Sequence, residues 1–432
     1  MKFVLFSPFA KASAIGRVTA LLVQACAPLG HSITIVRTEQ ESLLDTPAHA
    51  CDAPVIPWTD AAAVGAAIKA ADAVVYQIGN NYSYHRGGLS WLGIAPGIVC
   101  LHDFLVAHMF VEWAAGRDAE AREVLHEWYG ASAPTEFFAM KDPDAFVEMA
   151  SQRYPMTEWV AAMALGVISH SQWGMPRVAQ SCPGPLRVVP LPYDAPACKP
   201  AAPVAPDPQA PVHILTVGHM NANKRVESVI RAIGTSTTLR ERVSYRLCGR
   251  VEPPTERALK SLAESLGVTL VVSGETDDAA LQEAMNHADV VCCLRWPSFE
   301  AASATAIEGL LYGKAVVVTD TAFYSELPSD CVQKISPDNE LSELRTALEL
   351  LCNDADARNA LAARGQAWAT RTFNPTNYME QLADFARRTC AAEPLIGMVG
   401  AMTRDLSAWQ ASREIFGDEY LTQPLQLFQI DN

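Results

Sequence analysis

The stretch WPSFEAASATAIEGLLYGKAVVVTD, residues 296–320, shows the pattern from which the fold can be predicted. It opens with a short polar loop that carries Glu300, and small residues then lead into a helix predicted over 303–311. Gly313 is suited to end this helix, because glycine readily takes the left-handed conformation found after helix ends. The apolar run that starts at Ala315 predicts a buried strand. A loop, a helix and a buried strand in this order are typical of α/β proteins.

The same alternation of short apolar runs and helical segments extends along the whole chain. Most runs are continuously apolar, as expected for strands that are covered on both faces. Alternating strands and helices indicate parallel sheets with right-handed crossovers. Strands are predicted at 3–6, 33–37, 73–77, 98–101, 166–169, 186–189, 213–217, 244–248, 269–272, 290–294, 315–319 and 332–335.

A proline-rich stretch divides these strands into two series. Eight prolines lie between residues 190 and 211, and such a segment cannot continue a helix or a central strand. We therefore predict two α/β domains, at 1–193 and 212–385, joined by a linker at 194–211. We expect the tail, residues 386–432, to pack back on the first domain.

Residues 104–165 interrupt the first domain and predict a helical insertion that is rich in aromatic side chains. A helical subdomain packed on its own aromatic core is one interpretation. An aromatic surface for a sugar chain or a membrane is the alternative.

Composition excludes several classes of protein. Half of the residues are hydrophobic, which excludes wholesale disorder, and the formal charge of −15 argues against nucleic acid as the main partner. No run of 18 apolar residues predicts a membrane span, and the first residues indicate a strand and a turn rather than an export signal. Eleven cysteines without a CxxC motif indicate reduced thiols in a cytoplasmic protein.

Ligands of open α/β sheets bind beyond the carboxyl ends of the strands, and unusual polar residues follow several predicted strands here. The carboxylates of Glu300 and Glu308 are eight residues apart. Eight helical residues rise about 12 Å, which is comparable to the distance from the sugar to the ribose of a nucleotide sugar. The predicted helix start between them suits a diphosphate, because free amides and the helix dipole attract anions there.

A second segment, LTVGHMNANKRVESVIRAI at 215–233, places two cations where a helix is predicted to begin. Lys224 and Arg225 would oppose the helix dipole, so their position is easier to explain if they face an anion. An ordinary solvated pair is the alternative.

These segments resemble the retaining GT-B glycosyltransferases of family 4, the glycosyl transferases group 1. The resemblance covers nearly the whole chain and includes SPFAKASAIGR at 7–17, GHSITIV at 30–36, LHD at 101–103 and VISHS at 167–171. It implies an α/β GT-B fold, in which two Rossmann-like parallel-sheet domains face an interdomain cleft, here with the helical insertion in the first domain.

The resemblance also implies roles for individual residues. Lys224 would neutralise the donor diphosphate, and Glu308 would bind the ribose hydroxyls. Glu300 and His102 would lie near the donor sugar and the reacting centre, without a protein nucleophile being assigned. The other donor-binding residues implied are Gly16, His219, Arg250, Glu275, Thr276, Ala302, Ser303 and Ala304. This chain departs from the family pattern at two places. Many members have arginine at the position of His219, and many have glycines in the segment that corresponds to 301–304, which is Ala-Ala-Ser-Ala here.

The implied reaction moves a hexose-type sugar from a UDP- or GDP-linked donor to a hydroxyl of a glycan or lipid-linked glycan, with retention, in polysaccharide biosynthesis. The expected location is cytoplasmic, with at most peripheral contact at the inner membrane face. No cofactor and no metal are expected. Two DxD sequences, at 142–144 and 354–356, fit helix starts better than the metal motif of the other main glycosyltransferase fold.

Other classes fit less well. An NAD-dependent dehydrogenase would need GxGxxG after a strand, which the turn at 12–17 lacks. A two-lobed solute-binding protein would carry an export signal. A GT-B phosphorylase-like enzyme and an inactive sugar-nucleotide-binding relative stay open as alternatives.

Overall fold

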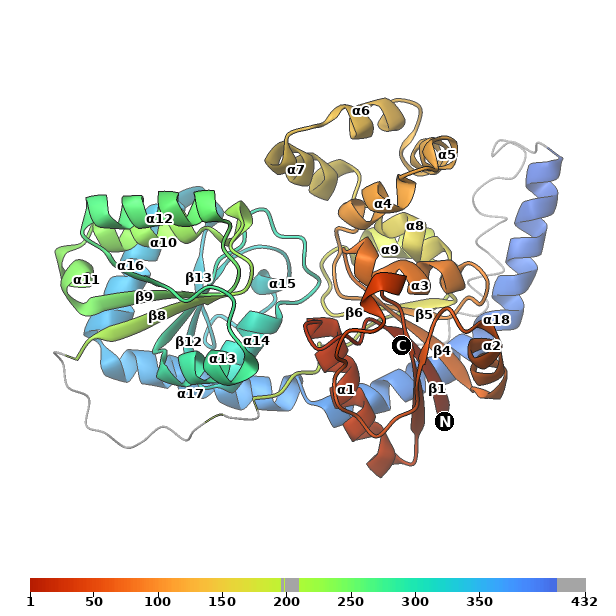
Figure 1. Ribbon diagram of the computed structural model, residues 1–432, viewed down its shortest axis with the longest axis horizontal. Helices are drawn as coiled ribbons and strands as arrows, with labels where there is room; N and C mark the ends of the chain where they lie inside the picture. Colours follow the sequence, from red (N-terminus) through yellow and green to blue (C-terminus); the bar gives the residue numbers. More distant parts are fainter. Residues whose placement is uncertain (196–197, 199–209, 410–432) are drawn as a thin grey trace.

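The computed structural model describes residues 1–195, 198 and 210–409, and it contains two lobes, each built on its own parallel sheet (Figure 1). The first sheet has seven strands in the order β3-β2-β1-β4-β5-β6-β7, and the second has six in the order β10-β9-β8-β11-β12-β13. All paired strands are parallel. The prediction of two Rossmann-like domains is therefore confirmed.

The first domain alternates strands with helices and carries a helical insertion between β5 and β6. Its strands are β1 (Lys2–Ser7), β2 (Ser32–Arg37), β3 (Val55–Pro57), β4 (Ala73–Ile78), β5 (Ile98–Leu101), β6 (Gly166–Ser169) and β7 (Leu186–Val188). Its helices are α1 (Ala14–Cys26), α2 (Ala61–Ala70), α3 (Tyr82–Leu92), α4 (Ala107–Ala114), α5 (Asp118–Tyr129), α6 (Ala133–Ala139), α7 (Pro143–Arg153), α8 (Thr157–Ala162) and α9 (Met175–Ser181).

The second domain repeats the pattern without an insertion. Its strands are β8 (Val212–Val217), β9 (Val243–Cys248), β10 (Thr269–Val272), β11 (Val290–Cys293), β12 (Ala315–Thr319) and β13 (Gln333–Ile335). Its helices are α10 (Val226–Gly234), α11 (Thr237–Arg242), α12 (Pro253–Leu266), α13 (Asp278–His287), α14 (Ala304–Leu311), α15 (Ala322–Ser325), α16 (Glu340–Asn353) and α17 (Ala355–Thr372), and α18 (Pro375–Ala408) follows.

All twelve predicted strands are present, and their ends lie within one residue of the predicted ends. The strands could be predicted because the central ones are continuous apolar runs. Strands β5, β6, β11 and β12 are buried at every position. The sequence prediction missed β3, a three-residue edge strand that ends in a proline and is partly exposed. Short edge strands with proline lack the apolar run that marks a central strand.

Residues 104–165 form the helices α4 to α8, which rise above the first sheet in Figure 1. Their aromatic side chains pack against one another: the ring of Phe110 lies 5.7 Å from that of Phe137 and 5.1 Å from that of Trp159. These side chains belong to a core cluster that continues to β4 and β5. The insertion is therefore a helical subdomain, but its core is shared with the first sheet rather than its own. Its aromatic side chains are buried or half-buried, which argues against an exposed aromatic surface.

The last helices connect the two lobes. Helix α17 packs on α14 and β12 of the second domain, and α18 crosses to the first domain, where it packs on α1 (Figure 1). Tyr378, Leu382 and Phe385 of α18 are buried in the core that contains Phe3 and Leu5 of β1. Most of the predicted linker and residues 410–432 of the predicted tail lie outside the described residues.

Candidate active site

The carboxyl ends of the two sheets meet between the domains. The loop after β11 lies against the loop after β5: the Phe104 N–H donates to the Phe299 carbonyl at 2.8 Å, and the Ala301 N–H donates to the His102 carbonyl at 3.0 Å. Asp103 and Glu300 form an isolated antiparallel bridge between these bonds. Candidate residues from both halves of the chain are thus brought together, as the rule for α/β sheets predicts.

Lys224 lies in the loop after β8, in a 3-10 turn that precedes α10. Its side chain is buried, and Nζ donates a hydrogen bond to the Val217 carbonyl at the end of β8. A side chain at position 218 would collide with this ammonium group, because a Cβ there would lie 2.3 Å from Nζ. Gly218, with a φ of +98°, therefore makes room for the lysine. Burial, and next the charge of Arg295, lower the pKa of Lys224 to about 7.

Glu300 is held by two side chains of its own domain. Arg295 Nε donates to Oε1 at 2.9 Å, and the Tyr324 hydroxyl donates to Oε2 at 2.8 Å. Burial raises the pKa of this carboxyl group, but the charge and hydrogen bond of Arg295 outweigh burial, so the pKa stays below its ordinary value. Both carboxylate oxygens are thus engaged, which keeps Glu300 ionised and fixed in place.

Helix α14 starts at Ala304, so only part of the interval between Glu300 and Glu308 is helical. The expected rise of about 12 Å assumed eight helical residues and is wrong for that reason. Ser303 is the N-cap and accepts a hydrogen bond from the Ala306 N–H at 3.4 Å. Ala302 and Ser303 are buried, and Ala304 is half-buried.

Glu308 lies on α14 and is paired with the other domain. Arg17 of α1 donates to its Oε1 at 3.0 Å and to Asp194 Oδ1 at 2.7 Å. The Arg17 guanidinium also lies over the ring of Tyr193, 4.4 Å from its centroid. Burial raises the pKa of Glu308 above its ordinary value, although Arg17 opposes that shift. The carboxylate predicted to bind ribose is therefore held in an ion pair that joins the two domains.

The first domain contributes neutral polar groups to the same place. His102, which follows β5, is buried and its Nε2 lies 2.6 Å from Gln77 Oε1. Its ring lies 4.9 Å from that of His170, which follows β6. Burial, with the nearby His170 and His85, holds the pKa of His102 well below its ordinary value, and burial lowers that of His170 to about 4. Both imidazoles are neutral at physiological pH.

Several buried polar atoms around this junction lack a hydrogen-bond partner among the described residues. In the first domain they are Gln77 Nε2, His85 Nδ1, His170 Nε2 and Ser171 Oγ, and in the second they are Asn223 Oδ1 and Ser298 Oγ. Buried polar groups are normally satisfied, so a group of such atoms indicates a place where a polar ligand or water completes the bonding.

The remaining candidate residues lie in the first turn of α1 or in loops at the surface of the second domain. Gly16 is in the first turn of α1, where a Cβ would lie 2.8 Å from His49 Cδ2 and 2.9 Å from the Pro8 carbonyl oxygen, so close packing explains the glycine. His219 and Arg250 are exposed, and Arg250 pairs with Glu252 at 2.8 Å. Glu275 is exposed, and Thr276 is half-buried. The loops that carry these residues are joined, since the Met220 N–H donates to the Arg250 carbonyl and the Gly249 N–H to the Gly274 carbonyl.

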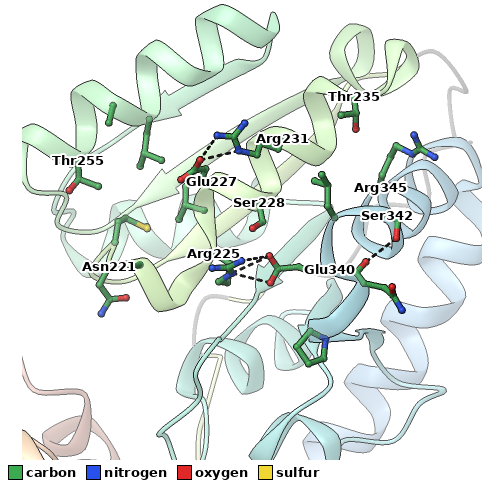
Figure 2. Close-up of a pocket in the computed structure, with 18 of the residues that line it drawn as sticks. Asn221, Arg225, Glu227, Ser228, Arg231, Thr235, Thr255, Glu340, Ser342 and Arg345 are labelled. Carbon is green, nitrogen blue, oxygen red and sulfur yellow. Dashed lines mark hydrogen bonds and ion pairs between the residues drawn. The ribbon is translucent and has the colours of Figure 1, made fainter. Parts of the chain in front are cut away.

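A separate pocket of about 1050 Å³ lies between α10, α12 and α16 of the second domain (Figure 2). Arg225 points into it and binds both carboxylate oxygens of Glu340 at 2.9 to 3.1 Å. The two neighbouring cations Lys224 and Arg225 therefore have different surroundings. Lys224 is close enough to Arg295 and Glu300 for their charges to shift its pKa, whereas Arg225 is neutralised in the pocket of Figure 2.

Sequence reasoning missed Arg17, Arg295 and Tyr324. The first two had a usable signal: Arg17 is a cation near a helix start, the argument applied to Lys224, and Arg295 comes directly after a buried strand. Tyr324 had no such signal, because a tyrosine in a short segment after a buried strand is common in proteins.

Both DxD sequences are helix starts, as predicted. Asp142 caps α7 by accepting from the Ala145 N–H at 2.9 Å, and Asp354 caps α17 by accepting from the Ala357 N–H at 2.8 Å. Within residues 1–195, 198 and 210–409, no group of three or more His, Cys, Asp or Glu side chains is arranged to hold a metal ion. In the same residues, every helix is too short or too polar to cross a membrane.

Comparisons with known proteins agree with this geometry. Residues 204–368 match the family model described as glycosyl transferases group 1, whereas none of the curated proteins compared matches the sequence. Sucrose-phosphate synthase from Thermosynechococcus elongatus has a similar structure, with a TM-score of 0.60 and 16% identity over 91% of this chain and 100% of that chain.

Two further structures are similar. The HepE protein of Anabaena, in complex with UDP-glucose, gives a TM-score of 0.59 with 17% identity over 89% of this chain and 99% of that chain. WaaG, a glycosyltransferase involved in lipopolysaccharide biosynthesis, gives 0.56 with 16% identity over 89% and 99%. The chain thus has the GT-B fold of glycosyltransferases, and its second half matches the model of glycosyl transferases group 1.

Proposed function

We propose that this protein is a retaining glycosyltransferase of family 4 that transfers a hexose-type sugar from a nucleotide diphosphate sugar to an acceptor hydroxyl. The observation that carries the proposal is the meeting of Lys224 and Glu300 with His102 at the junction of the two sheets. The match to the group 1 family model and the UDP-glucose complex of a structural neighbour support a nucleotide-sugar donor.

In this proposal the diphosphate binds beside Lys224 and the start of α14. Charge builds on the leaving diphosphate in the transition state, and a fixed ammonium group stabilises that charge without reorganisation. The acceptor lies against the neutral groups of the first domain, around His102. Glu300 orients the donor sugar, and the leaving phosphate helps to deprotonate the acceptor, so the reaction uses no protein nucleophile and no metal.

The acceptor is proposed to be a glycan or a lipid-linked glycan of polysaccharide biosynthesis, reached from the cytoplasm. UDP- and GDP-linked donors both fit the proposal. Two tests address the donor and the stereochemistry. UDP and GDP are added separately in a thermal-shift experiment, since a ligand at 100 times its Kd adds about 2.7 kcal/mol to the free energy of unfolding. The product of a transfer assay is then examined by NMR for the anomeric configuration, with and without a chelator.

A melting temperature that stays constant with every nucleoside diphosphate would contradict the proposal. An inverted product would remove the retaining mechanism, and loss of activity in chelator would remove metal independence.

An inactive relative that binds a sugar nucleotide is the second candidate function, and one observation favours it. Glu308 is already bound to Arg17, so the carboxylate predicted for ribose is engaged. Nucleotide release from the donor sugar, measured with and without added acceptor, separates the two. An active transferase releases nucleotide faster with acceptor, whereas the inactive relative binds the nucleotide without releasing it from the sugar.

A further inference from the structure

Arg295 is a buried arginine to which the motifs of the sequence assign no role. It directly follows β11, and its side chain is only 4% exposed. Its backbone is fixed, since the Arg295 N–H donates to Thr319 Oγ1 of β12 at 3.0 Å. An arginine this deeply buried is costly unless its charge and its donors are used.

Arg295 lies on the loop next to that of Lys224. Strands β8 and β11 are neighbours in the sheet, and the loops after them are joined because the Trp296 N–H donates to the Asn223 carbonyl at 2.8 Å. After burial, the charge of Arg295 is the largest influence on the pKa of Lys224, which shows that the two cations are close.

The positive charge of this cluster is only partly balanced. Lys224 and Arg295 are two cations, and Glu300 is the carboxylate that faces them, with both of its oxygens already bound to Arg295 and Tyr324. In the described part of the chain Lys224 forms no ion pair of its own. When Lys224 is protonated and the buried carboxyl group of Asp103 is neutral, one positive charge remains at the carboxyl end of the sheet, where an anion would balance it.

The donors of Arg295 are also only partly used. A guanidinium group has five N–H donors, and in the described residues Glu300 takes the Nε donor while the Leu294 carbonyl accepts one from Nη1 at 2.7 Å. In the same loop, the Ser298 hydroxyl is buried without a partner among the described residues. Phosphate oxygens accept hydrogen bonds, so a bound phosphate group would use both the free guanidinium donors and this hydroxyl.

We propose that Arg295 is a second cation of the diphosphate site, which binds phosphate oxygens of the donor beside Lys224 while its Nε holds Glu300 in place. The proposal rests on the proposed function and adds to it a residue that discriminates between phosphorylated and unphosphorylated nucleosides. A purely structural Arg295 would only orient Glu300 and would not contact the donor.

The test is a cycle of Arg295→Gln, Glu300→Gln and the double variant Arg295→Gln/Glu300→Gln. The double variant removes both members of the buried Arg295–Glu300 pair, so neither charge is left without its partner, and it is expected to fold even if Arg295→Gln alone does not. Calorimetry then measures the Kd of UDP, UMP and uridine, with the guanosine series in parallel. Tyr324→Phe is the matched control, because it removes the other hydrogen bond to Glu300 without a change of charge.

We expect Glu300→Gln and Tyr324→Phe to bind the diphosphate at least as well as the wild type. The double variant should bind the diphosphate about 10–100-fold more weakly than Glu300→Gln, the loss expected for a hydrogen bond to a charged group, and should bind the nucleoside equally well. Equal diphosphate affinity of the double variant and Glu300→Gln would overturn the inference, as would an equal loss for the nucleoside. Failure of the wild type to bind either diphosphate would instead overturn the proposed function.

Discussion

The two sides of the domain junction, called here the two walls, differ in how their polar groups are satisfied. On the wall of the second domain the groups are charged. Glu300 is held by Arg295 and Tyr324 and Glu308 by Arg17, whereas Lys224 forms no ion pair among the described residues. On the wall of the first domain the key groups are the neutral imidazoles of His102 and His170.

This difference suits the two halves of the proposed transfer reaction. A leaving diphosphate carries charge, so its wall needs fixed cations. Burial without an ion pair lowers the pKa of Lys224, and a bound anion would favour its charged form. An acceptor hydroxyl is neutral, so its wall needs donors and acceptors that a sugar can satisfy. Four buried atoms of the first wall, including Gln77 Nε2 and His170 Nε2, have no hydrogen-bond partner among the described residues, and a bound sugar could supply one.

The largest effect is expected from Lys224→Ala, which removes the unpaired cation of the charged wall. The transfer rate should fall about 10²–10³-fold, as it does when one stabilising contact to developing charge is lost, and the fold should be retained. The control is Arg225→Gln/Glu340→Gln, which removes the neighbouring cation together with its own partner. Normal turnover by Lys224→Ala would show that this wall does not bind the diphosphate.

The pH dependence of donor binding should follow the charged wall. Lys224, with a pKa lowered to about 7, is protonated below that pH and loses its charge above it, so diphosphate affinity should fall as pH rises, by up to about tenfold per unit. Asp103 acts in the same direction, because burial raises its pKa to about 7 and its ionisation adds negative charge beside Glu300.

The measurement is the Kd of the diphosphate between pH 6 and 9 for three proteins. The three proteins are the wild type, Lys224→Arg and Asp103→Asn. The affinity of Lys224→Arg should depend on pH much less than that of the wild type, since arginine stays charged. Asp103→Asn should keep the fall in affinity that the deprotonation of Lys224 causes. A wild-type affinity that stays constant across this range would contradict the assignment.

The neutral wall is tested by His102→Gln. Loss of the imidazole should lower kcat/KM for the acceptor about 5- to 10-fold, the value of one ordinary hydrogen bond. The Kd of the nucleoside diphosphate should not change. If the affinity for the nucleoside diphosphate falls as much as kcat/KM for the acceptor, the two walls do not have separate functions.

The smallest effect is expected at Arg17, the ion pair that joins the walls. Arg17→Met leaves Glu308 buried without its partner and should lower the free energy of unfolding by about 1–3 kcal/mol. For a single domain of about 150–250 residues, each kcal/mol lowers Tm by about 2–4 °C. Arg17→Met/Glu308→Gln should recover part of this loss, because no unpaired charge is then buried. A Tm that is unchanged in Arg17→Met would show that the pair contributes little to the interface.

The place of several candidate residues in the fold could be predicted because they follow strand ends. Lys224 and Glu300 follow apolar runs that are readable as buried strands, so their place at the carboxyl edge followed from the pattern. His102 was placed by the same reasoning. The partner of each group could not be predicted, since Arg17 and Glu308 are 291 residues apart and meet only when the domains pack.

The sequence by itself determined the two parallel sheets, the break between them and the edge at which polar residues collect, because continuous apolar runs and helix signals are local properties of the chain. Only the tertiary structure decided which charges meet: Arg17 with Glu308, Arg295 with Glu300, and Arg225 with Glu340 in the pocket of the second domain. Electrostatic pairing depends on distance in space and on burial, and a linear sequence fixes neither until both domains have folded.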